Sequence, residues 1–397
     1  MGEQRYFNKG LGLKKVVGVQ VVRDYFSDLI ERMRAEGFQW TAGDLTFHLA
    51  REFGFCYGVD RAIEYAYETR EKFPDRRVFI TGEIIHNPGV NRRLVDMEIR
   101  FLDGRHPGST YDDLGKNDVV ILPAFGVPVK ELERLRDLGC IVVDTTCGSV
   151  LNVWKNVERY AREGYTALIH GKYYHEETRA TASQALKYPG GHYIVVLDMG
   201  EADRLCDYLD GKSDAAELMR GFENAVSPGF DPEAHLERLG CANQTTMLSA
   251  ESLAIAEKVR KAMVRRWGEQ GAAERFRAFD TICTATQDRQ DALHALLGER
   301  RVDLTLIVGG YNSSNTGHLL EIALARGPAY HVLDARCIES AERIRHQKLN
   351  ERSESGTEGW LPAGPLAIGV TSGASTPNSE VEAVIRRVAE VRGTPVR

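Results

Sequence analysis

Short apolar runs alternate with amphipathic helical patterns along most of this chain, and the alternation limits the folds it can adopt. The runs typical of buried strands are residues 77–81, 118–125, 140–146, 165–170, 193–198, 303–310 and 366–373. Helical patterns such as residues 60–73 and 150–164 lie between most of them. Strand and helix in alternation predict an α/β architecture with mostly parallel sheets.

Size and charge narrow the class of protein further. A length of 397 residues suggests two or three domains. The net charge of −6 does not favour a general nucleic-acid-binding role. The N-terminus lacks an apolar signal core, and no apolar run approaches the roughly 18 residues of a membrane helix. We therefore expect a cytoplasmic protein that binds neither nucleic acid nor membrane.

The seven cysteines are an odd number, and in a reducing compartment they are better interpreted as thiols, catalytic groups or metal ligands than as disulfides. Cys56, Cys147 and Cys283 each fall where a strand should end and a helix begin. Ligands of α/β sheets bind beyond the carboxyl ends of strands, so these three can converge.

No Cys-x-x-Cys pair of the kind common in zinc sites is present. Three isolated thiolates suit an iron–sulfur cluster with one iron left for substrate, although spacing alone also fits buried structural thiols. The remaining cysteines are expected to be buried apolar side chains: Cys140, Cys206, Cys241 and Cys337.

Polar segments follow several of the predicted strands. They contain His86, His175 with Glu176 and Glu177, the run Gln244–Thr246, the run Ser313–Asn315, and Ser375 with Thr376. The last two open helices, whose free N–H groups bind phosphate oxygens well, although ordinary N-capping explains the same residues. No phosphate-loop motif or dinucleotide fingerprint is present. These donors therefore indicate a small phosphorylated ligand, with a carboxylate nearby that could move a proton.

Eight stretches together resemble one enzyme family, the 4-hydroxy-3-methylbut-2-enyl diphosphate reductases of the non-mevalonate isoprenoid pathway. They are FGFCYGV, GEIIHNP, VVDTTC, HGKYYHEET, NQTTM, TICTAT, GGYNSSNT and GVTSGASTP, in the family's order. The long N-terminal segment and VVILPAFG are similar to the form found in plants and cyanobacteria. The resemblance implies reductive removal of an allylic hydroxyl, giving isopentenyl and dimethylallyl diphosphate.

The resemblance also implies a trefoil of three α/β units around a central cluster cavity. We expect an N-terminal extension at 1–45 and units at 46–146, 147–281 and 282–375. Residues 376–397 would pack near the first unit. Residues 199–238 read as an insertion or loop-rich excursion in the second unit, and 352–365 as a connecting loop.

The resemblance assigns roles to named residues. A [4Fe-4S] cluster would be held by Cys56, Cys147 and Cys283, leaving one iron without a protein ligand. Glu177 matches the family's proton-delivering glutamate, Thr245 its hydroxyl partner, and Gln244 and Thr246 the adjoining wall. The diphosphate would be held by His86, His175, Ser313, Ser314, Asn315 and Ser375. Reduced ferredoxin or flavodoxin would supply electrons, in the cytoplasm or, in a plant, the plastid stroma.

This sequence departs from the family pattern at two positions. Phe125 stands where many bacterial members carry a diphosphate-binding histidine, which puts that contact in doubt. Gly148 replaces the proline that usually follows the second cysteine, which would loosen the turn but keep the ligand.

Three rival functions fit part of the pattern. A cluster-dependent hydro-lyase needs no net electrons, so a requirement for a reductant would distinguish the reductase from it. A redox sensor that binds a phosphorylated metabolite needs no acid beside the ligand, so the presence of Glu177 argues against a sensor. A structural zinc protein is distinguished by metal analysis.

Overall fold

The computed structural model describes residues 5–104, 110–279, 281–351 and 353–394. The chain divides into two compact units: unit 1 is Met1–Asn8 with Tyr111–Cys283, and unit 2 is Lys9–Thr110 with Thr284–Arg397. The predicted N-terminal extension adds a strand to each unit, β1 (Tyr6–Phe7) in unit 1 and β2 (Gln39–Ala42) in unit 2. The four-part division made from the sequence stays a prediction.

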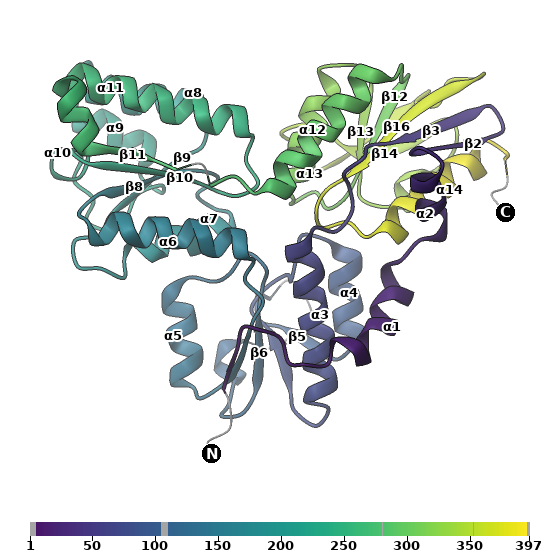
Figure 1. Ribbon diagram of the computed structural model, residues 1–397, viewed down its shortest axis with the longest axis horizontal. Coiled ribbons are helices and arrows are strands. Elements are labelled where there is room, and N and C mark those ends of the chain that lie inside the picture. Colours follow the sequence, from purple (N-terminus) through teal and green to yellow (C-terminus); the bar gives the residue numbers. More distant parts are fainter. Residues whose placement is uncertain (1–4, 105–109, 280, 352, 395–397) are drawn as a thin grey trace. The chain divides into compact units, whose positions relative to one another are not determined.

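A four-stranded parallel sheet in the order β11-β10-β8-β9 forms much of unit 1. Its strands are β8 (Thr166–His170), β9 (Tyr193–Val196), β10 (Leu239–Asn243) and β11 (Phe276–Ala278). The inner strands β8 and β10 are buried throughout, as expected when helices cover both faces. The helices α6 (Gly148–Arg162) and α7 (Glu176–Ala185) lie on one face, and α8 (Met199–Leu209) and α11 (Ser249–Arg275) on the other (Figure 1).

Unit 1 also contains a smaller parallel set of strands. In it β7 (Ile141–Asp144) lies between β1 and β6 (Val119–Leu122), and α5 (Val129–Asp137) packs beside β7. The short 3-10 turn η1 (Tyr111–Asp113) precedes β6 in the chain. Both β6 and β7 are fully buried, which accounts for their unbroken apolar sequences.

The segment 199–238, predicted to be an insertion or loop-rich excursion, is largely helical. It forms α8, α9 (Ala215–Phe222) and α10 (Pro232–His235). Each helix begins at an aspartate whose carboxylate accepts a backbone N–H bond: Asp198, Asp214 and Asp231. The Asp residues, and the glutamates that follow them by two or three positions, are N-terminal helix signals that outweigh the segment's polar composition.

A seven-stranded sheet in the order β15-β14-β13-β12-β16-β3-β2 organises most of unit 2. The strands not yet placed are β3 (Leu45–Leu49), β12 (Leu304–Val308), β13 (Ala329–Val332), β14 (Arg343–Gln347), β15 (Glu354–Glu358) and β16 (Leu366–Ser372). The central four run parallel, and β2, β14 and β15 are antiparallel.

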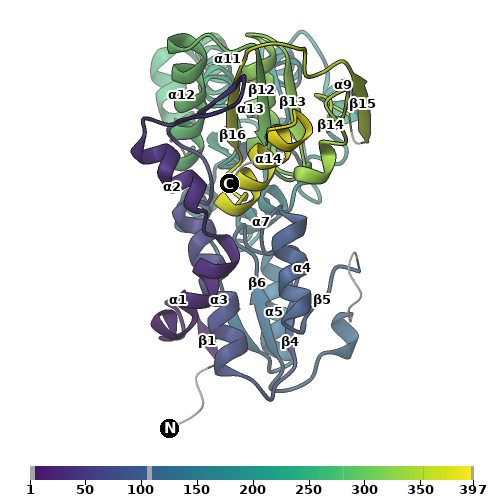
Figure 2. The same cartoon turned by 90° about the vertical axis from the view of Figure 1, so that its right-hand side faces the viewer.

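Helices cover both faces of this sheet. On one face α2 (Asp28–Ala35) and α14 (Asn378–Val391) bury Ile30 and Val384 in a core shared with Phe47. The helices α12 (Thr284–Glu299) and α13 (Ser314–Leu324) pack on the other side, and Figure 2 shows α14 across the near face. The 3-10 turn η2 (Ala335–Cys337) packs against α14.

The stretch 352–365, predicted to be a connecting loop, contains β15. This strand pairs antiparallel with β14, from Arg343 opposite Glu358 to Gln347 opposite Glu354. Its residues are exposed or half-buried in alternation, and none is a large apolar residue. The prediction was wrong because an edge strand of this kind carries no apolar pattern to reveal it.

The rest of unit 2 consists of a parallel strand pair and three helices. The pair is β4 (Val78–Ile80) with β5 (Ile99–Phe101), and the helices are α1 (Lys14–Tyr25), α3 (Tyr57–Lys72) and α4 (Pro88–Asp96). All seven apolar runs predicted as strands contain one. Among the described residues, no helix combines the length and the apolar character required to span a bilayer.

Candidate functional site

The predicted site residues fall into two groups, one in each unit. Unit 1 holds Cys147, His175, Glu177, Gln244, Thr245, Thr246 and Cys283. Unit 2 holds Cys56, His86, Ser313, Ser314, Asn315 and Ser375.

Cys147 and Cys283 occupy equivalent positions at the ends of strand-following turns in unit 1. Cys147 is the N-cap of α6, and its N–H donates to the Ala124 carbonyl at 2.7 Å. Cys283 directly precedes α12, and its N–H donates to the Thr245 carbonyl at 3.2 Å. The Ser149 hydroxyl, two residues after Cys147, donates to the Cys283 sulfur at 3.3 Å. Unit 1 therefore brings the segments carrying these two cysteines together.

Burial separates the seven cysteines as the sequence interpretation did. Cys56, Cys147 and Cys283 are partly exposed, whereas Cys140, Cys206, Cys241 and Cys337 are buried. Burial raises the pKa of the Cys206 thiol to about 11, and it also raises the pKa of the Cys140 and Cys241 thiols. Because the thiolate is the metal ligand, these three buried thiols are poorly suited to bind metal.

Glu177 and Thr245 form a buried pair in unit 1. Glu177 lies in the first turn of α7 and is only 3% exposed, and Thr245 follows β10. One carboxylate oxygen accepts the Thr245 N–H at 2.6 Å, and the other accepts its hydroxyl at 3.0 Å. The partnership predicted for these residues is present, and the hydroxyl can also accept a hydrogen bond when the carboxyl is protonated.

Gln244 holds the neighbouring wall in place. It is fully buried, and its side-chain oxygen accepts the Lys172 N–H at 3.1 Å and the Thr178 hydroxyl at 3.0 Å. Its amide nitrogen donates to the Thr246 hydroxyl at 2.8 Å. Gln244 thus orients Thr246, which is half-buried.

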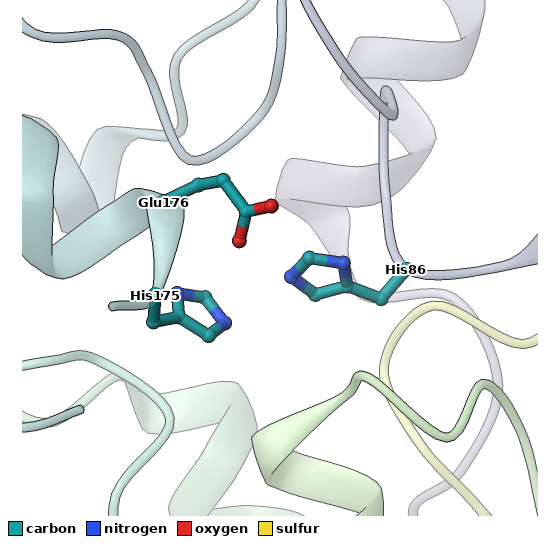
Figure 3. A group of neighbouring side chains, drawn as sticks. All are labelled: His86, His175 and Glu176. Atoms are coloured by element: carbon teal, nitrogen blue, oxygen red, sulfur yellow. The ribbon is translucent and has the colours of Figure 1, made fainter. Parts of the chain in front are cut away.

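His175 is the N-cap of α7, and Figure 3 shows His175 and Glu176 at the start of that helix. Its Nδ1 accepts the Glu177 N–H at 3.1 Å, so a neutral ring carries its hydrogen on Nε2 and can donate it to an anion. The ring meets Phe125 edge-on, with centroids 6.2 Å apart. Phe125, the residue that departs from the bacterial pattern, therefore contributes to the setting of His175 in this chain.

Cys56 ends a constrained turn in unit 2. It is the N-cap of α3, and its N–H donates to the Ala374 carbonyl at 3.3 Å. Gly54, two residues earlier, has φ +81°, and a Cβ there would lie 2.6 Å from the Asn378 side chain. The buried Arg289 donates to the Gly54 carbonyl at 2.6 Å. These contacts place Cys56 beside the segment that contains Ser375.

His86 lies between β4 and α4 and is drawn in Figure 3. Its Nδ1 is 3.0 Å from a carboxylate oxygen of Glu83, and both residues are buried. A carboxylate at this distance accepts a hydrogen carried on Nδ1 and thereby orients the imidazole ring.

The run 313–315 begins α13. The Ser313 hydroxyl accepts the Thr316 N–H at 3.3 Å, which is the ordinary capping role that the sequence left open. Asn315 is 1% exposed, and neither its amide nitrogen nor its oxygen has a hydrogen-bond partner among the described residues. Buried polar groups are rarely left unpaired, so this amide indicates a place for a polar ligand.

Close backbone approaches draw three segments of unit 2 together. A Cβ at Gly310 would lie 2.1 Å from the His86 carbonyl, and one at Gly373 would lie 2.0 Å from the Thr316 hydroxyl. Thr376 is buried and donates to the Val308 carbonyl at 3.1 Å, whereas Ser375 is half-exposed. Unit 2 thus gathers the segments of Cys56, His86, Asn315 and Ser375.

The sequence interpretation missed residues that hold the predicted ones. These residues are Glu83, Ser149 and Thr178. Of the three, only Glu83 could have been predicted from the sequence, because it lies three residues before His86 and an acidic residue so close can contact the histidine. Ser149 follows Cys147 by two residues but contacts Cys283, a residue 134 positions away, which no local pattern predicts.

Parallel α/β units with polar side chains gathered beyond their strand ends define an α/β protein of the kind that binds ligands at those ends. The chain belongs to the LytB protein family, whose model matches residues 47–389. A Thermosynechococcus vestitus protein named 4-hydroxy-3-methylbut-2-enyl diphosphate reductase is 46% identical over 390 residues, covering 98% of this chain and 95% of that protein. A Gloeobacter violaceus protein of the same name is 46% identical over 398 residues, covering 99% and 94%.

Two solved structures are similar to this chain. One, described as (E)-4-hydroxy-3-methyl-but-2-enyl diphosphate reductase, the terminal enzyme of the non-mevalonate pathway, is 28% identical with a TM-score of 0.51. It is matched over 87% of this chain and 99% of its own. The E-1-hydroxy-2-methyl-but-2-enyl-4-diphosphate reductase of Plasmodium falciparum, 23% identical over 85% and 86% of the two chains, has a TM-score of 0.62 and shows the fold alone. The predicted family resemblance and the α/β fold class with mostly parallel sheets are confirmed.

The turn after Cys147 generates the first prediction. Gly148 is the first residue of α6, where proline is favoured, and a Cβ there meets no atom within 4 Å. Cys147 already has φ −63° and ψ 146°, the conformation that a following proline requires. Gly148→Pro should therefore raise the free energy of unfolding by about 0.4–1 kcal/mol, measured by urea titration. Gly148→Ala is the matched control, and a Pro variant less stable than the Ala variant would contradict the backbone conformation described.

Asn315 generates the second prediction. Replacing an unpartnered buried amide by a side chain of similar size removes a cost of about 1–3 kcal/mol, so Asn315→Leu should not destabilise the ligand-free chain. If pyrophosphate raises the melting temperature of the parent chain, Asn315→Leu should reduce that rise. Asn91→Leu is the control, because the Asn91 amide bonds Ile84 and Ile85 and its loss should destabilise unit 2. Equal destabilisation by both variants would show that Asn315 has partners in the free protein.

Proposed function

We propose that this chain catalyses the reductive dehydroxylation of 4-hydroxy-3-methylbut-2-enyl diphosphate to isopentenyl and dimethylallyl diphosphate. Relatives carrying this enzyme's name match the chain over nearly its full length. One observation carries the proposal within the structure: the three predicted cluster ligands are the three partly exposed cysteines, and each sits at the start of a helix.

The donor set fits an iron–sulfur cluster. Thiolates are the ligands that such clusters prefer, and these three cysteines are partly exposed. Each lies at the start of a helix, where the positive end of the helix dipole favours the negative charge of a thiolate. Cys56, Cys147 and Cys283 would hold a [4Fe-4S] cluster with one iron left for substrate. When bound, the cluster supplies single electrons and a Lewis-acidic iron for the substrate's hydroxyl group.

The reaction removes the hydroxyl as water and adds hydrogen to carbon, so it consumes two electrons and two protons. Glu177, as a carboxylic acid, would give a proton to the leaving hydroxyl, because hydroxide itself leaves poorly. Thr245 fixes the direction of that carboxyl group through both of its oxygens. The Thr245 hydroxyl can pass on a hydrogen bond, since it accepts and donates at once.

The diphosphate would be bound by imidazole, hydroxyl and amide donors. His86, supported by Glu83, and His175, with its hydrogen on Nε2, provide two of them. The unpartnered Asn315 amide supports a third, and Ser313, Ser314 and Ser375 complete the set. Gln244 and Thr246 would line the wall beside the reacting carbon atoms. Water excluded from such a pocket no longer competes for the proton.

The two electrons would come from a second protein. We assign this role to reduced ferredoxin or flavodoxin. Seven free thiols support a reducing compartment, the cytoplasm or, in a plant, the plastid stroma.

The acid role is tested with Glu177→Gln. The amide can still accept the Thr245 N–H and donate to its hydroxyl, so folding, cluster content and ligand binding should survive. The rate should fall by about 10²–10⁴, because the amide cannot donate a proton as an acid does. The measurement is anaerobic turnover with product analysis. Glu201→Gln, which alters a carboxylate that accepts the Leu197 N–H, is the control. Turnover of the Glu177 variant near the parent rate would remove its acid role.

The ligand role is tested with Cys147→Ser. We expect a colourless, iron-poor protein when iron and sulfide are counted after oxygen-free purification, because a neutral hydroxyl is a poor substitute for a thiolate. Cys206→Ala, at a buried cysteine, should keep the parent's iron content. A brown Cys147 variant with all its iron would exclude this residue from the ligand set.

A further inference from the structure

One polar contact near the predicted cluster ligands has no role in the function proposed above. The Ser149 hydroxyl, in the first turn of α6, donates to the Cys283 sulfur at 3.3 Å. It therefore joins the helix that begins after one predicted ligand to the sulfur of another. Ser149 and Cys283 both belong to unit 1, so the contact lies within one compact unit.

We propose that Ser149 tunes the reduction potential of the bound cluster by hydrogen bonding to the Cys283 sulfur. The inference rests on the proposed function, because it requires Cys283 to be a cluster ligand. A thiolate has no hydrogen to give, so in the loaded protein the serine hydroxyl is the donor. Hydrogen bonds to cluster sulfurs are among the factors that set cluster potentials.

The direction of the effect follows from charge. A reduced cluster is more negative than an oxidised one, and the extra charge is spread over its sulfur atoms. A hydroxyl that points at one of these sulfurs stabilises the reduced state more than the oxidised state. Ser149 should therefore make the cluster easier to reduce, which favours a reaction that draws electrons from a protein donor.

The backbone around the contact is well held on both sides. Cys283 donates its N–H to the Thr245 carbonyl, and the Thr281 hydroxyl accepts the Asn243 N–H at 3.1 Å, so the segment before α12 is attached to the end of β10. On the other side, the Cys147 N–H donates to the Ala124 carbonyl, and the Cys147 carbonyl accepts the Leu151 N–H at 3.0 Å in the first turn of α6. The Ser149 hydroxyl therefore belongs to a helix whose first turn is held in place by hydrogen bonds.

Ser149 is also suited to this role by its place in α6. It is the second residue of the helix and is half-buried, so water competes only partly for its hydroxyl. A serine at this place commonly bonds to backbone groups of its own helix turn. The bond to Cys283 instead leaves the helix and reaches a residue 134 positions away.

The test compares Ser149→Ala, Ser149→Thr and the parent as anaerobically loaded holoproteins. Midpoint potentials are measured by redox titration followed by electron paramagnetic resonance. We expect the Ala variant to have a more negative midpoint and the Thr variant, which keeps the hydroxyl, to stay near the parent. Asn152→Ala, at an exposed position in the same helix, is the control and should not shift the potential.

A second readout detects the hydrogen itself. After exchange into deuterated water, electron–nuclear double resonance of the reduced cluster should show an exchangeable hydrogen that is lost in Ser149→Ala and kept in Ser149→Thr. A merely structural role would not remove this coupling.

The possible outcomes are distinct. A parent that binds no cluster overturns both the proposed function and this inference. A parent with a normal cluster, and an Ala variant with unchanged midpoint and unchanged coupling, overturns the Ser149 inference alone. If the Ala variant loads no cluster, a Thr variant that loads normally supports the need for the hydroxyl, and a Thr variant that also fails overturns it.

Discussion

A sulfur that binds metal must be reachable and yet firmly held, and the junction between a strand-following turn and a helix meets both needs. Cys56 and Cys147 are N-caps, and Cys283 directly precedes α12, so the backbone of each is tied by hydrogen bonds while its side chain stays partly exposed. The other four cysteines lack this placement and are buried. The two units can be understood as scaffolds that supply such junctions, because parallel strands deliver their following turns to one edge of a sheet.

Each unit also holds its polar side chains through partners of its own. In unit 1 the Glu177 carboxylate is fixed by Thr245, and Gln244 orients Thr246. In unit 2 Glu83 supports His86, and the glycines at 310 and 373 allow neighbouring segments to approach closely. A side chain held in this way loses little entropy when a ligand binds, which is the physical meaning of a preorganised site.

Periodicity predicted the seven main strands, because buried parallel strands are apolar along their whole length. It failed at the edge strand β15, which has no large apolar residue. It also missed the helices in 199–238, where aspartate caps and buried apolar residues such as Leu205 and Phe222 lie within a mostly polar segment. The site residues were found through motifs, whereas the residues that hold them were found only by their contacts. Glu83 contacts a histidine three positions away, whereas Ser149 and Thr178 contact residues that lie 134 and 66 positions away in the sequence.

By itself, the sequence determined the α/β class, the family and the residue types at the site, because these depend on local patterns and on motifs in a fixed order. The tertiary structure alone decided which carboxylate oxygen each Thr245 donor meets, that the Ser149 hydroxyl reaches the Cys283 sulfur, and that the Asn315 amide is buried without a partner among the described residues. The reason is that burial and hydrogen-bond pairing depend on neighbours supplied by distant segments. Those neighbours exist only once the sheets and helices have packed.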